Sequence, residues 1–213
     1  MEIFSLIFSP IEVNTYILAD QSGDCAIIDC GCYDRSEFRE LTDLIEGKKL
    51  NPVLLLNTHC HLDHIFGNRF ILEKYKLSAY YHKEDDKNRE NAVNHSIVFG
   101  LSMETPPKPA GFLGDGQKIS FGKTILKALH VPGHTKGSLA FYSEDDNVVF
   151  TGDALFTGSI GRTDLPGGNY DTLIESIKSK LFVLPPETIV YPGHGYQTTI
   201  EREIRYNPYF QEH

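Results

Sequence analysis

The order of apolar and polar residues predicts alternating strands and helices in the first part of the chain. Residues 13–19 and 25–29 are short runs of strand-forming residues separated by the turn-forming sequence DQSGD, so they are expected to pair as strands. Residues 52–57, PVLLLN, are almost continuously apolar, which predicts a strand buried on both faces. A helix around residues 71–75 and a strand at residues 78–82 are expected to follow.

A further helix is predicted between the second and third of these strands. Asp34 and Glu37 have the spacing of a capping box, in which the first residue caps the amino end of a helix and the other lies in its first turn. Phe38, Leu41 and Ile45 then follow at intervals of three and four residues. The two signals together predict a helix with one apolar face.

The second half of the chain is predicted to be mainly β-structure, with helices only near its end. The expected elements are hairpin strands at 118–121 and 124–130 and at 139–142 and 148–151, a helix at 173–181, a strand at 188–194 and a helix at 198–206. Between the two halves, residues 84–114 are polar and then rich in proline, without a clear period. A loop or lid is expected there.

This order of elements indicates one domain, residues 1–213, with two similar halves. A sheet or helix that is apolar on one side must bury that side against another element, which limits domains to a few layered architectures. Two sheets packed face to face with helices outside fit the predicted order. The expected fold class is therefore α/β, an αββα sandwich of two mixed β-sheets flanked by helices.

Charge and cysteine content narrow the function classes. The formal net charge is -9 and the basic residues are scattered, so nucleic acid is not an expected partner. The first residues lack the features of a secretion signal, and acidic residues interrupt any apolar run, so no membrane association is expected. Four cysteines, at 25, 30, 32 and 60, are expected to be reduced thiols, which predicts a cytoplasmic protein. The protein is expected to be a monomer or a homodimer. The role of the Cys30 and Cys32 pair stays open.

Histidine and aspartate residues gather in four segments that each follow an apolar run. The segments are THCHLDH, VPGHTKGS, TGDALF and YPGHGY. Because the ends of several strands can meet at one edge of a sheet, their side chains are expected to come together. The candidate metal ligands are His59, His61, Asp63, His64, His134, Asp153 and His194. Five imidazoles and two carboxylates are enough for two divalent metal ions, and this ligand set suits zinc but also iron or manganese.

The motifs THCHLDH, PGHT, TGD and GHG, in this order, resemble the signature of the metallo-β-lactamase superfamily over nearly the whole chain. Within it, TGDALFTGSIGRTDLPGG and NPYF are most similar to the glyoxalase II, or hydroxyacylglutathione hydrolase, group, and the chain resembles a short, single-domain branch of that group. The resemblance implies an αββα fold. It also implies that His59, His61 and His134 hold a first metal, that Asp63, His64 and His194 hold a second, and that Asp153 bridges them.

The resemblance implies a metal-dependent hydrolase that cleaves a small thioester, such as S-lactoylglutathione, with a hydroxide held between two metal ions. Zinc is the first expectation. Coordination lowers the pKa of water from about 15.7 to roughly 7, which supplies hydroxide at neutral pH. The second cation can polarise the substrate carbonyl. Asp63 is the candidate catalytic residue, as a ligand that also accepts a proton.

Arg162, in GSIGRTDLPGG, is the candidate substrate-binding residue, because the glyoxalase II pattern carries a basic residue there that contacts glutathione. Asp164 stands where that pattern has a tyrosine, and the chain ends soon after His194, whereas the full-length family adds a helical domain with further glutathione contacts. The acyl group and thiol carrier are therefore left open. The alternatives are a mononuclear iron persulfide dioxygenase of the same fold, which shares GRTD, a lactonase or other ester hydrolase, and a non-catalytic metal-binding module.

Overall fold

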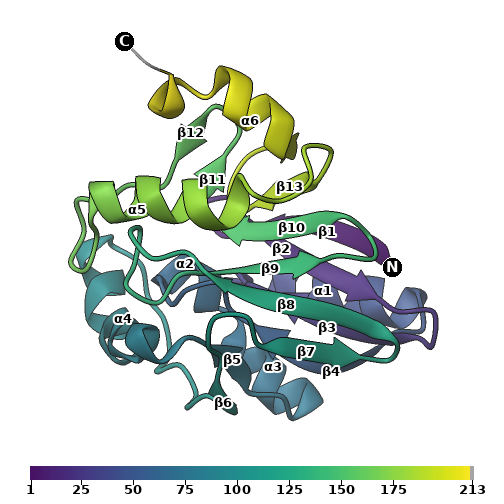
Figure 1. Cartoon of the computed structure of the whole chain (residues 1–213). Coiled ribbons are helices and arrows are strands. Elements are labelled where there is room, and N and C mark those ends of the chain that lie inside the picture. Colours follow the sequence, from purple (N-terminus) through teal and green to yellow (C-terminus); the bar gives the residue numbers. More distant parts are fainter. Residues whose placement is uncertain (212–213) are drawn as a thin grey trace.

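The computed structural model describes residues 1–211 and contains two six-stranded sheets that pack face to face (Figure 1). The strands of the first sheet, in spatial order, are β1 (Glu2–Phe8), β2 (Val13–Ala19), β3 (Asp24–Ile28), β4 (Asn51–Leu56), β5 (Ala79–Tyr81) and β6 (Gly111–Phe112). Strands β1 to β3 are antiparallel neighbours, whereas β3 to β6 run parallel. The first sheet is therefore mixed.

The second sheet is also mixed, and its strands come from the second half of the chain. In spatial order they are β14 (Thr198–Thr199), β13 (Ile189–Pro192), β10 (Val148–Gly152), β9 (Leu139–Ser143), β8 (Thr124–His130) and β7 (Lys118–Phe121). Only the β10 and β13 pair is parallel within this sheet as described. A separate hairpin consists of β11 (Leu155–Phe156) and β12 (Ser159–Ile160).

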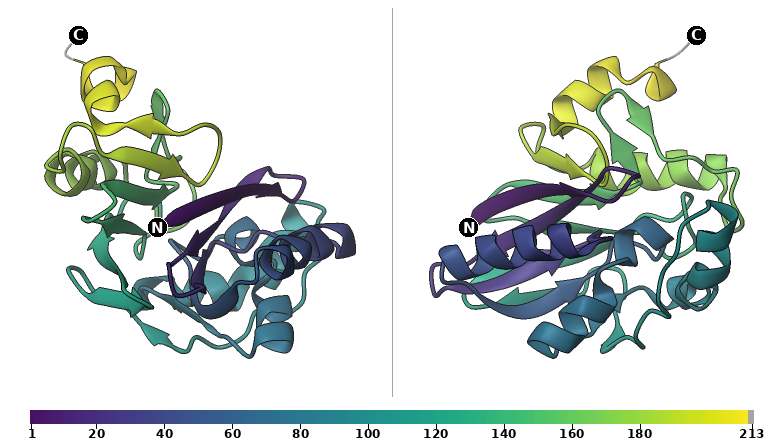
Figure 2. Two further views of the ribbon diagram at one scale, coloured as in Figure 1. Left: turned by 90° about the vertical axis from the view of Figure 1, so that its right-hand side faces the viewer. Right: turned by 180° about the vertical axis from the view of Figure 1, so that it is seen from behind.

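Helices cover both outer faces of the paired sheets (Figure 2). They are α1 (Arg35–Gly47), α2 (Leu62–Ile65), α3 (Asn68–Tyr75), the 3-10 turn η1 (Lys83–Asp85), α4 (Asp86–Val98), α5 (Tyr170–Ser176), the π-helical turn η2 (Ile177–Leu181), α6 (Ile200–Tyr206) and the 3-10 turn η3 (Pro208–Phe210). Apolar residues of α1 and α3 pack on the first sheet. Those of α5, η2 and α6 pack on the second.

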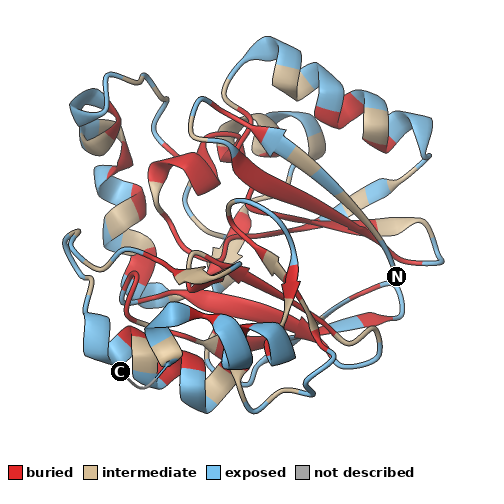
Figure 3. Ribbon diagram, turned by 90° about the horizontal axis from the view of Figure 1, so that it is seen from above, coloured by how far each residue is buried: buried red, intermediate tan, exposed pale blue. Residues whose placement is uncertain are grey.

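Alternating side chains on the central strands fill three apolar layers. On β2, Tyr16 and Leu18 belong to the layer between the two sheets, whereas Ile17 and Ala19 belong to the layer beneath α1 and α3. This is the period of two that a strand buried on both faces requires. Figure 3 shows the result, with buried strands at the centre and helices that are buried only along their inner sides. The predicted αββα sandwich is confirmed.

Asp34 caps the amino end of α1 as predicted, but Glu37 bonds to other residues than the capping box requires. Asp34 accepts hydrogen bonds from the backbone N–H groups of Ser36 and Glu37, at 2.8 and 3.1 Å. The Glu37 carboxylate bonds to the N–H groups of Ser9 and Tyr33, at 2.7 and 2.6 Å, instead of returning to Asp34. Glu37 thus joins the start of the helix to the loop after β1.

The prediction of a loop for residues 84–114 is wrong over its first half, where α4 forms. The helix has no apolar face, and its buried residues are Arg89, Ala92 and Ser96. A hydrogen bond from the Tyr81 hydroxyl to the Asp86 carboxylate, at 2.8 Å, attaches it to β5 instead, and an ion pair within the helix, from Arg89 Nε to Asp86 at 2.6 Å, holds that carboxylate. A helix held by polar contacts leaves no hydrophobic period in the sequence. Over residues 1–211, no helix is both long and apolar enough to cross a membrane.

Candidate metal centre

The four predicted loops leave the same end of the two sheets and bring their histidines and aspartates together. His59 and His61 follow β4, and Asp63 and His64 lie in the short helix α2. The other three ligands follow strands of the second sheet, His134 after β8, Asp153 after β10 and His194 after β13. The centre therefore lies where the two halves of the chain meet.

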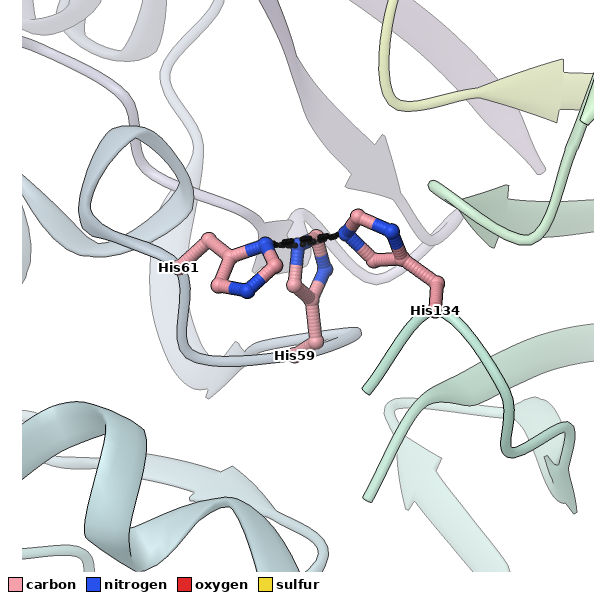
Figure 4. Close-up of side chains that lie close together, drawn as sticks. All are labelled: His59, His61 and His134. Atoms are coloured by element: carbon pink, nitrogen blue, oxygen red, sulfur yellow. Dashed lines mark hydrogen bonds between the residues drawn. The ribbon is translucent and has the colours of Figure 1, made fainter. Parts of the chain in front are cut away.

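Three imidazole nitrogens converge on one point, which we call site 1 (Figure 4). His59 Nε2 lies 3.1 Å from His61 Nδ1 and 3.2 Å from His134 Nε2, and the latter two nitrogens are 2.9 Å apart. A neutral imidazole has a single N–H, so three mutual hydrogen bonds cannot all form. A triangle of nitrogens aimed at one another is the arrangement that a shared cation would complete.

A second group, which we call site 2, contains Asp63, His64 and His194. Asp63 Oδ2 lies 3.5 Å from His64 Nε2 and 3.2 Å from His194 Nε2. The two oxygens of Asp153 face different sites: Oδ1 is 3.2 Å from His64 Nε2, and Oδ2 is 3.6 Å from His134 Nε2. Asp153 thus lies between sites 1 and 2.

Two buried atoms at the boundary of the sites lack hydrogen-bond partners. They are His64 Nε2 and Asp153 Oδ1, neither of which makes a hydrogen bond to any described residue. Leaving a buried polar group without a partner costs about 1–3 kcal/mol, and more for a charged group, so such atoms are rare in folded proteins. A divalent cation bound between them would satisfy both. The donor set and its unsatisfied atoms therefore fit a metal centre.

Backbone carbonyls fix the ring orientation of two of the histidines. The Nδ1 of His134 lies 2.8 Å from the carbonyl oxygen of Arg162, and the Nδ1 of His194 lies 3.1 Å from that of Glu12. A carbonyl oxygen only accepts, so each Nδ1 carries the hydrogen and donates it outward. The lone pair of each Nε2 is then directed into the centre, as metal ligation requires.

Asp29 performs the same task for the other two buried histidines. Its Oδ2 accepts from His64 Nδ1 at 2.9 Å and from the Thr58 hydroxyl at 2.6 Å. The Thr58 oxygen lies 3.1 Å from His59 Nδ1 and accepts from it, because its own hydrogen is already donated to Asp29. His59 therefore also presents an Nε2 lone pair to the centre, and the Nε2 atom of His64 faces the centre as well.

Local backbone geometry brings Asp153 close to the His59 loop. The pairing of β10 with β13 shifts register between Phe150 and Gly152, and such irregularities are common beside functional sites. Gly152 has a φ of 49°, and a Cβ there would collide with the Thr58 side chain. Glycine is therefore required on both conformational and steric grounds.

The electrostatic environments of the two sites differ. Burial, reinforced by the neighbouring imidazoles, lowers the pKa of His59 well below its ordinary value. The same causes lower the pKa of His61 to about 3. At site 2, burial alone would lower the pKa of His64, but three carboxylates led by Asp153 outweigh it and raise the pKa. The charge of His64 in turn outweighs burial and lowers the pKa values of Asp63 and Asp153, which are therefore ionised.

The predicted substrate residue Arg162 lies beside site 1, but its guanidinium is already paired. Its carbonyl oxygen accepts from His134. Its Nε and Nη2 donate to the two oxygens of Asp164, at 2.7 and 2.8 Å, and both side chains are exposed. The structure thus places Arg162 at the edge of the centre, with its guanidinium bonded to Asp164.

Sequence reasoning missed two buried carboxylates, Asp29 and Asp85, that hold the ligand loops. Asp29 does follow a strand, as the ligands do, and this position was a usable signal. Asp85 lies in a polar stretch that has no recognisable pattern. Cys30 and Cys32, whose role was open, are free thiols that are fully buried in the apolar layer under α1.

A protein-family model described as the metallo-beta-lactamase superfamily matches residues 9–194 of this chain. The probable metallo-hydrolase YqgX of Bacillus subtilis (strain 168) is 38% identical over 202 residues, which cover 94% of this chain and 93% of that protein. The hydroxyacylglutathione hydrolase GloC of Haemophilus influenzae is 36% identical over 200 residues, which cover 93% and 92%. These likenesses extend over nearly the full length of each pair.

Solved structures of similar proteins have the same fold as this chain. The BLEG-1 B3 metallo-beta-lactamase superposes with a TM-score of 0.91 at 32% identity, covering 99% of this chain and all of that one. TTHA1623 in a di-iron-bound form gives 0.87 at 38% identity, covering 97% and 99%, and ETHE1 from Myxococcus xanthus gives 0.79 at 27%, covering 98% and 84%. On its fold, its histidine and aspartate metal site and these matches, the chain belongs to the metallo-beta-lactamase superfamily.

Proposed function

We propose that this protein is a dinuclear metal-dependent hydrolase whose substrate is a small thioester. The observation that carries the proposal is the position of Asp153, whose two oxygens face two separate donor sets with outward-bonded imidazoles. A single mononuclear site would not need the second set. The thioester class is supported by the likeness to the hydroxyacylglutathione hydrolase GloC.

In this proposal, His59, His61 and His134 would hold one cation and Asp63, His64 and His194 would hold the other, with Asp153 serving both. When bound, two divalent cations lower the pKa of a coordinated water to about 7 and polarise a substrate carbonyl. Zinc is our first choice because the ligands are imidazoles and carboxylates. Iron is the main alternative, since the related TTHA1623 binds two iron ions.

We assign proton transfer to Asp63. Its carboxylate is ionised and mostly buried, and it lies within 3.2 Å of His194. Overall, the water oxygen bonds to the acyl carbon, the C–S bond breaks, and the sulfur leaves with the bonding electron pair. Asp63 accepts a proton from the water and passes it to the departing thiolate, which yields an acid and a free thiol.

Arg162 is the proposed anchor for an acidic group on the thiol carrier. The guanidinium is exposed beside site 1, and a fork of two N–H donors suits a carboxylate. Asp164 occupies that fork, so a substrate carboxylate must replace Asp164 rather than meet a free cation. Because an exposed ion pair contributes no more than about 1 kcal/mol, this exchange is energetically easy.

We also propose a cytoplasmic location and a monomeric or homodimeric state. The location is supported by four free cysteines, all buried and none in a disulfide among the described residues. Reduced thiols of this kind are typical of a reducing compartment. The reaction itself needs only a small-molecule substrate.

The test is to measure metal content and two activities on the same purified protein. We expect two equivalents of divalent metal, hydrolysis of S-lactoylglutathione and no oxygen uptake with glutathione persulfide. One iron per chain with oxygen consumption would establish the dioxygenase alternative instead. Metal without turnover on any ester or thioester would indicate a non-catalytic module. His134→Ala should lose turnover, whereas His95→Ala, on α4 and outside both sites, is the matched control.

A further inference from the structure

A buried carboxylate outside the ligand set connects the two loops that carry site 1. Asp85, at the end of η1, is fully buried. Its Oδ2 accepts from the backbone N–H of Cys60 at 2.7 Å, and its Oδ1 accepts from that of Gly137 at 3.0 Å. Cys60 lies between His59 and His61, and Gly137 lies three residues after His134. One side chain therefore joins the two loops that carry the three histidines of site 1.

The loop around His134 is shaped for this contact. A Cβ on Gly137 would lie 2.7 Å from the backbone nitrogen of Asp85 and 2.8 Å from its Oδ1. Real Cβ atoms essentially never approach other atoms this closely, so an alanine there would push the loop away from Asp85. The absence of a side chain at Gly137 is what lets the carboxylate reach the amide.

The charge of Asp85 has no local counterpart. It makes no ion pair with any residue between 1 and 211, and its third contact is a long hydrogen bond of 3.4 Å from the neutral amide of Asn88. Burying a carboxylate without a cation is unfavourable unless other charges compensate for it. The ligands of site 1 are three imidazoles, and a cation held there would supply the missing positive charge.

Asp29 and Asp85 hold the same turn from two sides. The amide of Thr58 donates to Asp29 at 2.7 Å, and the amide of Cys60, two residues later, donates to Asp85 at 2.7 Å. Asp29 also contacts His64 of site 2 directly. Among the ligand segments, the Asp85 carboxylate bonds to the two loops of site 1.

We propose that Asp85 is a positioning residue for site 1, which holds the His59–His61 turn and the His134 loop at the separation where three imidazoles accept one divalent cation. This rests on the metal-binding part of the proposed function. Residues that orient metal ligands typically contribute about 10- to 100-fold in metal affinity. Loss of Asp85 should therefore weaken binding at site 1 by that factor and leave site 2 near its original affinity.

Asp85→Asn is the sharpest variant. Asparagine keeps the size of the side chain and is a good residue at the amino end of α4, but it has one acceptor oxygen and an NH₂ group. The NH₂ group must then face the N–H of Cys60 or of Gly137, which breaks one of the two connections. Asp86→Asn is the matched control, because Asp86 bonds to Tyr81 and Arg89 and contacts neither ligand loop.

The experiment is a Zn²⁺ titration of metal-free protein against a chelator, followed by Co²⁺ substitution and visible absorption spectroscopy. For Asp85→Asn we expect one ion to bind about 10- to 100-fold more weakly, the other ion to bind as in the wild type, and one component of the Co²⁺ spectrum to change. Asp86→Asn should bind both ions normally even if its melting temperature falls.

Wild-type affinity for both ions in Asp85→Asn would overturn the proposal, as would an equal loss of both ions. Gly137→Ala attacks the same connection from the other loop and must show the same selective loss, so it decides the question if Asp85→Asn does not fold. If the wild-type protein binds no metal, the proposed function fails. If it binds two ions and both variants do the same, only the role of Asp85 fails.

Discussion

Sites 1 and 2 lie on either side of Asp153, yet they are built from different side chains. Site 1 consists of three imidazoles, and burial and the neighbouring imidazoles lower the pKa values of His59 and His61. Site 2 includes the carboxylate of Asp63, and the pKa values of its histidines are raised by the neighbouring carboxylates, which outweigh burial. In site 1 the protein must therefore force similar groups together, whereas in site 2 opposite charges attract. This explains why site 1 needs additional support from buried residues around it.

Asp153→Ala removes the one residue to which we assign a role in both sites and should have the largest effect. Metal content should fall for both ions, and thioester hydrolysis should be lost. Elemental analysis and a turnover assay on the same sample check this. If the variant kept two ions and full turnover, the idea of a centre joined by Asp153 would have to be abandoned.

Asp29→Asn is expected to weaken both ions, by about 10- to 100-fold each, because Asp29 orients His64 directly and His59 through Thr58. This distinguishes it from Asp85→Asn, for which only one ion should be affected. Chelator competition with Zn²⁺ measures both affinities. A loss confined to one ion would show that Thr58 does not transmit the effect of Asp29 to site 1.

Asp164→Asn changes the loop of the proposed substrate residue Arg162 and leaves the candidate metal ligands in place, so its effect on activity should be smaller. Freeing Arg162 should lower KM for S-lactoylglutathione by up to about fivefold, the equivalent of 1 kcal/mol for an exposed ion pair, without a change in kcat. Arg162→Ala should raise KM. Steady-state kinetics on both single variants and on the double variant measure how far a substrate carboxylate replaces Asp164 at Arg162. An unchanged KM in both single variants would remove Arg162 from the substrate site.

His82 and His130 form a histidine pair outside the centre and should give the smallest effect. Their ring centroids are 4.1 Å apart in a stacked arrangement. Burial, and to a smaller extent the charge of His130, lowers the pKa of His82. The unfolded chain, with a histidine pKa of about 6.5, then binds more protons, so this contribution to stability is present above about pH 6.5 and is lost as pH falls. His82→Asn, which keeps an acceptor for the Glu84 amide, should flatten the fall in melting temperature between about pH 7 and pH 5. An equally steep fall in the variant would contradict this.

Much of the fold is readable from the sequence because its apolar pattern is regular. The strand-forming residues of β2 predict a strand, the apolar run of β4 predicts a strand buried on both faces, and Asp34 marks the start of α1. Helix α4 escapes prediction because it has no apolar face, and a hydrogen bond from Tyr81 of β5 to Asp86 attaches it to the first sheet. Its polar pattern is the same as that of a loop.

The candidate ligands are also readable, because each lies in a segment that follows a strand and such segments converge. The residues that support them are not. Asp85 lies 25 residues from Cys60 and 52 from Gly137, and only the folded chain shows that its two oxygens join these loops. Likewise, the pairing of Arg162 with Asp164 depends on the conformation of an exposed loop.

The most direct test of the central claim is anomalous diffraction from crystals of the metal-loaded protein, collected at the absorption edge of the bound metal. We predict two peaks about 3.5–4 Å apart, the spacing of two-metal sites. One peak should lie among His59, His61 and His134, the other among Asp63, His64 and His194, and Asp153 should lie between them. A single peak, or peaks away from these seven side chains, would contradict a dinuclear centre.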